Sequence, residues 1–354
     1  MNRSIHVAIL GASGYGAAEL LRLFTQHPAV EVVSVTSTSR AGERVDAIHP
    51  HLRGFWDLKA TESINFDRLL AGEHAVVFST LPHGASGAAL DRLLNELEPK
   101  DRGERVKIVD LSGDLRLRDA AIHQRFYRES PVLPNRRASF VYGMPELFRE
   151  LVRDARCVAN PGCLATASIL AAAPLVTREF TGPIAIDAKT GSSGSGRALK
   201  ETTHHPTRHA DFRAYKPLAH QHEPEILQAL DDPHGRRIQT SFVAHSMDAA
   251  RGIFVTLHAT LAETLDADAL RRRYESFYAD SPFVRVLTGS PTLQDVVGSN
   301  FCDVSVACRE RQVVVMAALD NLIKGMAGTA IQNMNLMCGL PEPTGLWTPS
   351  LRPL

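Results

Sequence analysis

One cysteine and a pair of histidines carry the clearest chemical signal in the sequence. The stretch "NPGCLATASIL" places Cys163 after a proline–glycine turn and at the start of an apolar helix. The positive end of a helix stabilises a thiolate, which is the nucleophilic form of cysteine. Because free cysteine is also among the most frequently buried residue types, a packing role for Cys163 is the competing interpretation.

The other four cysteines lie in apolar or strand-like settings and are interpreted as packing residues: Cys157, Cys302, Cys308 and Cys338. The total of five is odd, and the cysteines form no C-x-x-C pair. This usage argues against a disulfide framework and against a structural zinc site, and it suits a reducing cytosol.

A thiol nucleophile needs a partner that moves protons, and "AHQHEPEI" offers His220 and His222. We expect the two side chains to point to opposite faces of an extended segment, so that only one of the two imidazoles faces the site. A metal-binding pair is the alternative, but no third ligand with recognisable spacing accompanies the two histidines. We therefore predict no metal.

A glycine-rich loop follows the first predicted strand. In "LGASGYGAAEL", Gly11, Gly14 and Gly16 lie between the strand Ile5–Leu10 and a helix. Glycine allows the tight turn and lets the backbone approach a pyrophosphate at the helix N-terminus. At the first βα junction this spacing predicts dinucleotide binding, with a plain tight turn as the alternative.

The end of the second predicted strand distinguishes NAD from NADP. The stretch "VTSTSRAGE" provides Ser37, Ser39 and Arg40 and no acidic residue before Glu43. An acidic residue here would bind the ribose 2′-hydroxyl group, whereas arginine suits a 2′-phosphate. The sequence therefore favours NADP, and a solvated loop arginine is the competing interpretation.

A nicotinamide cofactor, a thiolate and a histidine in one chain indicate one kind of chemistry. The cysteine takes an acyl group from an activated carboxylate, a hydride from the cofactor reduces the thioester, and the histidine moves the protons.

A parallel sheet must position the glycine loop. Short β-branched runs alternate with helical patterns in the first half of the chain, which is typical of a doubly wound α/β fold. The predicted strands are Ile5–Leu10, Val30–Thr38, His74–Pro82 and Val106–Gly113.

The pattern changes after Cys163. A helix over Thr166–Leu175 precedes alternating strands, one of which begins at Arg236, and this predicts an α+β domain. For 354 residues two domains are the default expectation. We expect a Rossmann-like NADP-binding domain, an α+β catalytic and dimerisation domain, and a C-terminal helix that returns to the first domain, over residues 1–159, 160–318 and 319–354.

The charge balance gives no reason to expect nucleic acid or an anionic membrane as a partner. Lys+Arg and Asp+Glu both total 39, and the isoelectric point is near 7.3. The N-terminal apolar run is far too short for a signal peptide or a membrane span. We expect a cytoplasmic protein.

Ten motifs spread nearly end to end carry a resemblance to a known family. They are "GASGYGAAELLRLFTQHP", "STLPHG", "VDLSGDLRL", "VYGMPEL", "NPGC", "SGSGR", "AHQHEPEI", "RGI", "GSNFCDV" and "DNLIKGMAGTAIQNMNLM". As a set they resemble the N-acetyl-γ-glutamyl-phosphate reductases of arginine biosynthesis, which are relatives of aspartate-semialdehyde dehydrogenase. The resemblance implies NADPH-dependent reduction of N-acetyl-L-glutamyl 5-phosphate through a thioester on Cys163, with His222 as general acid/base.

The resemblance also implies binding roles. Residues implied at the cofactor are Gly11, Ser13, Gly14, Tyr15, Gly16, Ser37, Ser39, Arg40, Pro82, Gly194, Gly196 and Asn321. Residues implied at the substrate are Ser112, Arg116, Asn160, Arg197 and His220. The alternatives are a helix cap for Asn321, a surface position for Arg197 and a solvated side chain for Lys324, which the resemblance places near the cofactor or the domain junction.

Three departures from the family pattern bear on this assignment. Gly16 and Ala17 replace a Thr-Gly pair, which the phosphate loop tolerates. Leu164 and Ala165 replace a Tyr-Pro pair after "NPGC", and a stretch rich in His and Arg, residues 201–217, replaces apolar residues. The last two are similar to the lysine-pathway branch, which reduces aminoadipyl phosphate on a small acidic carrier protein. An ordinary anion-binding substrate site is the alternative for the cationic stretch.

The competing functions are therefore arginine-pathway reduction, reduction of carrier-bound or N-protected 2-aminoadipate 6-phosphate, and a non-catalytic NADP-binding sensor. The complete set of cysteine, histidine and glycine loop argues against the sensor. The resemblance further suggests a homodimer or homotetramer with the sheet of the second domain at the interface.

Overall fold

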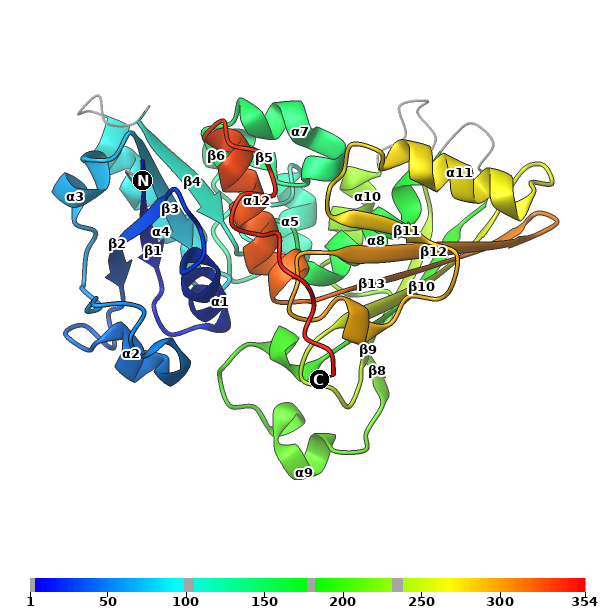
Figure 1. The fold of residues 1–354 in the computed structure, drawn as a ribbon, viewed down its shortest axis with the longest axis horizontal. Coiled ribbons are helices and arrows are strands. Elements are labelled where there is room, and N and C mark those ends of the chain that lie inside the picture. The colour runs from blue at the N-terminus through cyan, green and yellow to red at the C-terminus, as the bar shows by residue number, and fades with distance from the viewer. Residues whose placement is uncertain (1–3, 99–104, 177–181, 231–237, 354) are drawn as a thin grey trace. The chain divides into compact units, whose positions relative to one another are not determined.

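Two units can be distinguished along the chain, each built around its own sheet (Figure 1). The first comprises Met1–Pro161 and Met326–Trp347, and the second comprises Gly162–Gly325 and Thr348–Leu354. The structure is a computed structural model that describes residues 4–98, 105–176, 182–230 and 238–353. The last seven residues, which the sequence assigned to the returning C-terminal segment, belong to the second unit.

The first unit contains a six-stranded parallel sheet in the order β2-β1-β3-β4-β6-β5. Its strands are β1 (Ile5–Leu10), β2 (Val30–Thr36), β3 (His74–Ser79), β4 (Val106–Asp110), β5 (Phe140–Tyr142) and β6 (Cys157–Ala159). The chain order reverses at β1, which has β2 on one side and β3 on the other, and ligands of doubly wound sheets bind beyond the strand ends at such a point. The prediction of a doubly wound α/β fold is confirmed.

Helices connect these strands. They are α1 (Tyr15–Phe24), α2 (Val45–Ile48), η1 (Pro50–Leu52), α3 (Phe66–Leu70), α4 (Ser86–Leu97), α5 (Ala120–Phe126), α6 (Pro134–Ala138), α7 (Pro145–Arg153) and α12 (Gly328–Met337). In α1 the apolar side chains Leu20, Leu21 and Phe24 are buried, as the periodicity of this segment requires. Every residue of α12 is buried, so its polar side chains must be hydrogen-bonded inside the protein: Gln332 Nε2 donates to Glu342, and Asn335 Nδ2 donates to two backbone carbonyls.

The second unit contains a mixed seven-stranded sheet in the order β11-β12-β13-β10-β7-β9-β8. Its strands are β7 (Ile184–Thr190), β8 (Arg213–Tyr215), β9 (Thr240–Ser246), β10 (Ile253–Thr260), β11 (Val284–Leu287), β12 (Cys302–Arg309) and β13 (Gln312–Leu319). Most neighbours are antiparallel, but β7/β9 and β11/β12 are parallel pairs that the sequence did not predict. The strand expected from Arg236 begins at Thr240, and Arg236 lies outside the described residues.

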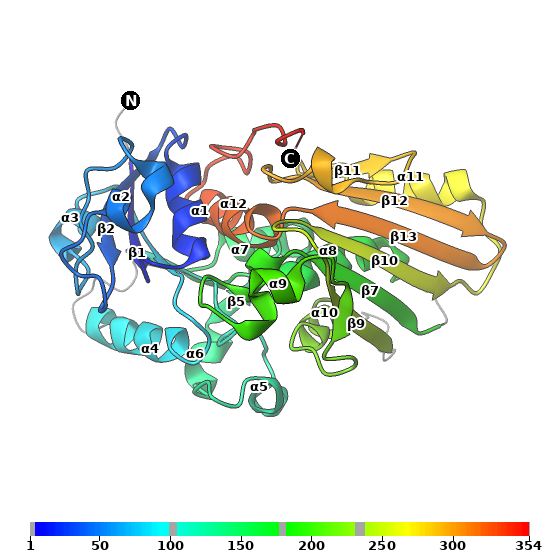
Figure 2. The same cartoon turned by 90° about the horizontal axis from the view of Figure 1, so that it is seen from below.

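Three helices cover one face of this sheet: α8 (Cys163–Ala172), α10 (Glu223–Ala229) and α11 (Ala267–Phe277). The Tyr274 and Tyr278 hydroxyls each donate at 2.6 Å to a backbone carbonyl of α8, and this fixes α11 against α8. Figure 2 views the opposite face of the sheet. The remaining short segments are η3 (Ala173–Leu175), η4 (Ser192–Ser195), η5 (Glu201–Thr203), α9 (His205–Arg208), η6 (Leu293–Asp295) and the π-helical turn η7 (Ile323–Ala327).

His123, in α5 of the first unit, makes the stability of the protein depend on pH. Its imidazole is fully buried, stacks on the Tyr127 ring at 5.1 Å, and has no hydrogen-bond partner at either nitrogen. Burial, assisted by the Arg137 guanidinium and opposed by Asp114, lowers the pKa of His123 from 6.5 to about 4. Between these values the unfolded chain binds a proton that the folded protein does not.

We therefore expect the His123 contribution to stability to be complete above pH 6.5 and to be lost as the pH falls to about 4. The total loss is about 3 kcal/mol from the size of the pKa shift. The His123→Phe variant keeps an aromatic ring on Tyr127 but cannot take up the proton. Urea unfolding of both proteins between pH 4 and 7 checks this, because the difference between their free energies of unfolding must change across that range. Parallel pH curves would contradict it.

Candidate active site

Cys163 is the first residue of α8 in the second unit. Gly162 precedes it as N-cap with extended backbone angles (φ −72°, ψ 144°), and the first turn of the helix carries no acidic residue. Cys163 is partly exposed, whereas the other residues of α8 are buried. A thiol at this position lies next to the free amides and the positive end of the helix dipole.

The other cysteines differ from Cys163 in their surroundings. Burial raises the pKa of the Cys157 thiol to about 11 and that of Cys338 to about 12, and it also raises the pKa of Cys308. Cys302 is fully buried in β12. These four thiols therefore have the environment of packing residues, as the sequence indicated.

Two glycines allow close packing around Cys163, one immediately before it in the chain and one in η7. A Cβ atom on Gly162 would lie 2.4 Å from Nε2 of His222, and a Cβ atom on Gly325 would lie 2.7 Å from Cβ of Cys163. The His222 imidazole therefore packs against the peptide that leads into the cysteine, and the turn η7 packs directly behind it. The fold of the second unit thus brings Cys163 and His222 to the same turn.

His220 supports His222 rather than facing away from it. The two rings contact each other edge to face at 4.7 Å, and the His222 amide donates to Nδ1 of His220 at 3.1 Å. The expectation that the two side chains point to opposite faces is wrong: residues two apart in an extended segment share one face, and residues 217–222 form a turn in this structure. Burial, followed by His222 and Lys216 and opposed by Glu225, lowers the pKa of His220 to about 2, so its imidazole stays neutral.

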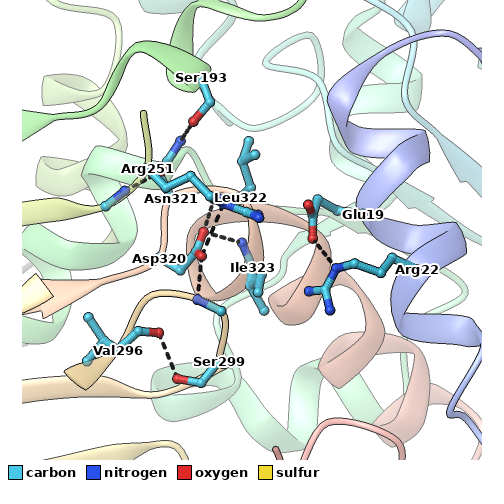
Figure 3. A network of polar contacts seen from close by, with 12 residues as sticks. Glu19, Arg22, Ser193, Arg251, Val296, Ser299, Asp320, Asn321, Leu322 and Ile323 are labelled. Atoms are coloured by element: carbon cyan, nitrogen blue, oxygen red, sulfur yellow. Dashed lines mark hydrogen bonds and ion pairs between the residues drawn. The ribbon is translucent and has the colours of Figure 1, made fainter. Parts of the chain in front are cut away.

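A polar network in the second unit fixes η7 and residues 191–197, "GSSGSGR", which are called the glycine-rich segment below (Figure 3). Oδ1 of Asp320 accepts from the amides of Leu322 and Ile323 at 2.8 and 3.2 Å, and its Oδ2 accepts from the Gly298 amide and faces Arg251. Asn321 accepts from the Gly252 amide at 2.8 Å and donates to Oγ of Ser193 at 2.9 Å. Both ends of the buried Asn321 amide group are therefore engaged within this unit.

The other residues predicted in the glycine-rich segment lie on the surface. Gly194, Gly196 and Arg197 are exposed, and a Cβ atom on Gly196 would meet nothing within 4 Å. Gly196 also has φ +81°, which favours glycine. The segment is open on this side, and its ligand roles stay predictions.

The glycine loop of the first unit forms a cradle at the start of α1. Gly11 has φ +95°, and a Cβ atom there would lie 3.0 Å from Oγ1 of Thr80. Gly14 is the N-cap of α1, no side chain caps the helix, and its first turn has no acidic residue. A Cβ atom on Gly14 would have the nearest atoms at 3.9 and 4.0 Å, so it would fill free space above the helix end. Ser13, Tyr15 and Gly16 complete this loop.

The end of β2 carries the side chains expected to distinguish the cofactors. Oγ of Ser37 lies 3.5 Å from Oγ of Ser39. Arg40 donates to both carboxylate oxygens of Glu43, at 3.0 and 2.7 Å, in a surface ion pair. Pro82 follows β3, and its carbonyl accepts from the amide of Ser86 at the start of α4.

The three residues of the first unit predicted at the substrate are buried and bonded inside that unit. Ser112 donates to Asp110 through both its amide and its hydroxyl group. Arg116 donates to the carbonyls of Asn160 and Leu111 at 2.7 and 2.8 Å. Asn160 uses all four polar groups, with Asp110 O, Arg116, Nδ2 of Asn333 and Met326 O as partners. Within this unit Ser112 is bonded to the end of β4, whereas Arg116 and Asn160 fix the chain directly after β6.

Three residues near the site were not identified from the sequence. Tyr215 in β8 packs its ring on His220 at 5.6 Å, and its pKa is raised by burial and by Cys163. Asp320 organises η7, and Glu225 is fully buried in α10. For the two carboxylates, the sequence signal that could have identified them is an acidic residue beside apolar residues, because a buried charge needs a role. Asp320 stands at the end of "VVVMAALD", and Glu225 lies within "EPEIL".

The described residues contain no group of three or more His, Cys, Asp or Glu side chains that could hold a metal ion. Among the helices of the described ranges, none is long and apolar enough to cross a membrane.

Comparisons with known proteins identify the family to which the chain is similar. A family model described as "Semialdehyde dehydrogenase, NAD binding domain" matches residues 6–155, and "Semialdehyde dehydrogenase, dimerisation domain" matches residues 163–321. An N-acetyl-gamma-glutamyl-phosphate reductase of Desulforudis audaxviator is 41% identical over 99% of this chain and 100% of its own length. The same-named protein of Symbiobacterium thermophilum is 43% identical over 97% of both chains.

A solved structure shares the fold at much lower identity. It is a probable aspartate-semialdehyde dehydrogenase from Pseudomonas aeruginosa, 18% identical, with a TM-score of 0.67 over 94% of this chain and 98% of that one.

Proposed function

Because the chain belongs to the N-acetyl-gamma-glutamyl-phosphate reductase family of the semialdehyde dehydrogenases, we propose that it reduces N-acetyl-L-glutamyl 5-phosphate with NADPH to N-acetyl-L-glutamate 5-semialdehyde and phosphate. The observation that carries this proposal is Cys163 at the start of α8, with the His222 ring against the preceding glycine. The membership makes the chain an oxidoreductase, and the substrate and the preference for NADPH are the proposed part.

Acylation of Cys163 is the first step. The thiolate attacks the carbonyl carbon of the acyl phosphate, a C–S bond forms, the C–O bond to phosphate breaks, and phosphate leaves with the electron pair. The helix end favours the thiolate over the thiol. Cys163 is half-buried, so the residue is not closed off from an incoming carbonyl group.

His222 manages the proton in the second step. The nicotinamide cofactor supplies, when bound, the hydride that reduces the thioester carbonyl. The His222 imidazolium donates its proton to the oxygen that becomes negative. When the C–S bond breaks, His222 takes the proton back, the aldehyde leaves, and the Cys163 thiolate is restored. His220 stays neutral and holds the His222 amide, so it orients this group.

The residues of the first unit fit a dinucleotide cofactor. The cradle at Gly14 leaves room for a phosphate where a side chain would intrude, and the open end of α1 supplies its amides. The loop Gly11–Gly16 would hold the pyrophosphate, and Ser37, Ser39 and Arg40 would hold the 2′-phosphate that distinguishes NADPH.

We expect Arg40→Ala to raise the KM for NADPH and to leave the KM for NADH unchanged. A charge-assisted hydrogen bond to phosphate is worth about 1.5–3 kcal/mol, which corresponds to a rise of about 10- to 100-fold. Arg40 can exchange its exposed partner Glu43 for the phosphate, because such a surface pair stabilises little. Steady-state kinetics with both cofactors checks this, and Arg44→Ala, in the same loop and paired with Asp46 and Asp57, is the matched control. An equal rise in the KM for NADH would contradict the proposal that Arg40 recognises the 2′-phosphate of NADPH.

The cationic stretch offers less free charge than its composition indicates. Arg208 is buried and donates to Ser246 and to backbone carbonyls, and Arg213 pairs with Asp211 at 2.6 Å. This arrangement favours the five-carbon substrate without a carrier over the carrier-bound six-carbon substrate. Exposed side chains that a carrier would meet include His204, His205, His209 and Lys216, which donates to the neutral Gln221.

A substrate panel tests the function. Purified protein is assayed for NADPH oxidation with N-acetylglutamyl phosphate and with N-acylated aminoadipyl phosphate, each with and without an acidic carrier protein at low and high salt. We expect turnover of the five-carbon substrate without a carrier. A carrier requirement that weakens with salt would establish the lysine-pathway alternative. Absence of turnover with every substrate, despite NADPH binding, would establish the sensor.

We also propose that the open face of the seven-stranded sheet binds a second copy of the chain. The helices lie on one face, and the other presents partly exposed apolar side chains, namely Val243, Phe254, Val314 and Met316. The dimerisation description of residues 163–321 supports this, and a homodimer or homotetramer is the expected assembly. All five cysteines are free, which supports a cytoplasmic location.

Met316→Asp is expected to weaken self-association about tenfold or more, because it places a charge in an apolar interface. Analytical ultracentrifugation over a range of concentrations measures the change. Ser276→Asp, exposed on α11 in the helical layer, is the control and should associate as the wild type does. An unchanged assembly for Met316→Asp would exclude this face.

A further inference from the structure

Glu225 is a fully buried carboxylate in an apolar stretch of α10. Its sequence neighbours Pro224 and Ile226 are buried with it. A buried carboxylate is costly unless hydrogen-bond donors surround it, so its partners indicate its role.

One partner is the peptide that presents the nucleophile. The Gly162 amide donates to Oε2 of Glu225 at 2.9 Å. The carbonyl of the same residue accepts from the amide of Thr166 at 2.8 Å and from its hydroxyl group at 3.1 Å. Both polar groups of Gly162 are thereby fixed, one by α10 and one by α8.

Gly162 needs this restraint because it has no side chain. The His222 ring occupies the place of a Cβ atom, so only glycine fits there, and glycine has more backbone freedom than any other residue. Rotation about the Gly162 backbone changes the direction of the Cα–Cβ bond of Cys163, which follows in the chain. The Glu225 hydrogen bond therefore opposes the motion to which the thiol position is most sensitive.

We propose that Glu225 is a positioning residue for Cys163, acting as the hydrogen-bond acceptor that fixes the Gly162 amide. This inference rests on the proposed function for its kinetic consequence and on the geometry for its structural one. The reaction needs the sulfur at a defined place relative to the acyl carbon, and a displacement of about 1 Å can cost about 10²-fold in rate.

Two substitutions of Glu225 test separately whether its hydrogen-bond acceptor or its negative charge fixes the Gly162 amide. Glu225→Gln removes the negative charge and retains an oxygen at the same reach. Glu225→Asp retains the charge and withdraws the oxygen by one methylene group. The matched control is Glu223→Asp, in the same first turn of α10, where Oε1 accepts from Oγ1 of Thr240 at 2.9 Å instead.

We expect Glu225→Gln and Glu223→Asp to keep kcat within about threefold of wild type. For Glu225→Asp we expect a loss of about 10- to 100-fold in kcat with an unchanged KM for the acyl phosphate. A residue that only stabilised the fold would lower the melting temperature without this split between kcat and KM, and it would not be rescued by glutamine.

Alkylation of Cys163 by iodoacetamide, followed by peptide mass spectrometry, tests the geometry without any substrate. We expect slower alkylation in Glu225→Asp and a wild-type rate in Glu225→Gln. If no acyl phosphate is reduced even by the wild type, the proposed function fails, whereas the alkylation rates still decide the positioning role. If Glu225→Asp does not fold, an altered alkylation rate in Glu225→Gln overturns the proposal, and an unchanged rate supports it.

Two kinetic results would overturn the proposal. Full activity of Glu225→Asp with loss in Glu225→Gln would show that the charge acts and not the acceptor. Equal kcat values in both variants, whether unchanged or reduced, would show that the hydrogen bond to Gly162 does not position the thiol.

Discussion

The Cys163→Ser variant is expected to lose acyl-phosphate reduction by about 10⁴-fold or more while it binds NADPH as the wild type does. A serine hydroxyl group has the same place at the start of α8, but it is not ionised near neutral pH, and the helix end cannot lower its pKa far enough. The nucleophile is therefore lost and the cofactor cradle, which lies in the other unit, is not changed. Stopped-flow turnover and NADPH fluorescence titration measure the two properties.

Cys308→Ser is the matched control, because Cys308 is also partly exposed but lies in β12 and donates to the Leu265 carbonyl. It should retain wild-type turnover. Near-normal rates in Cys163→Ser would show that the reaction does not pass through a thioester on this residue.

The His222→Ala variant is expected to lose about 10²- to 10⁴-fold in kcat, which is the usual contribution of a positioned general acid and base. The imidazole packs on Gly162, the residue before Cys163, and both proton transfers are assigned to it. The loss should appear in acylation and in reduction, since the ring supports the thiolate in the first and carries the proton in the second. Rapid-quench measurement of phosphate release and of aldehyde formation separates the two steps.

His220→Phe distinguishes the roles of the two histidines. The His220 ring is neutral, with a pKa near 2, and it packs between Tyr215 and Phe242, so a phenyl ring retains the packing and loses the acceptor for the His222 amide. We expect a smaller loss than in His222→Ala. A larger loss in His220→Phe would transfer the acid/base role to His220.

The sequence allowed much of the fold to be predicted because its strongest signals are local and periodic. The predicted strand Ile5–Leu10 is β1 residue for residue, and the next three strands along the chain begin at the predicted residues Val30, His74 and Val106. Apolar runs and turn residues determine such elements within a short window. The parallel pairing of β7 with β9 could not be predicted, because strand partners depend on contacts between residues far apart in the chain.

The site was predictable by residue type and not by arrangement. Cys163 and His222 follow from their motifs, but the contact of the His220 and His222 rings lies in a turn, which the sequence was not expected to form. The close approaches at Gly162 and Gly325 require the complete second unit. Sequence marks these glycines only as possible turns, whereas the structure shows that side chains occupy the space a Cβ atom would need.

The most direct measurement is phosphate release in the absence of any nicotinamide cofactor. On mixing excess N-acetylglutamyl phosphate with the protein, we expect a burst of one phosphate per chain, accompanied by an acyl adduct on the peptide that contains Cys163, and neither in Cys163→Ser. A burst of the same size in Cys163→Ser, or turnover with NADPH in the absence of any burst, would contradict a thioester at this cysteine.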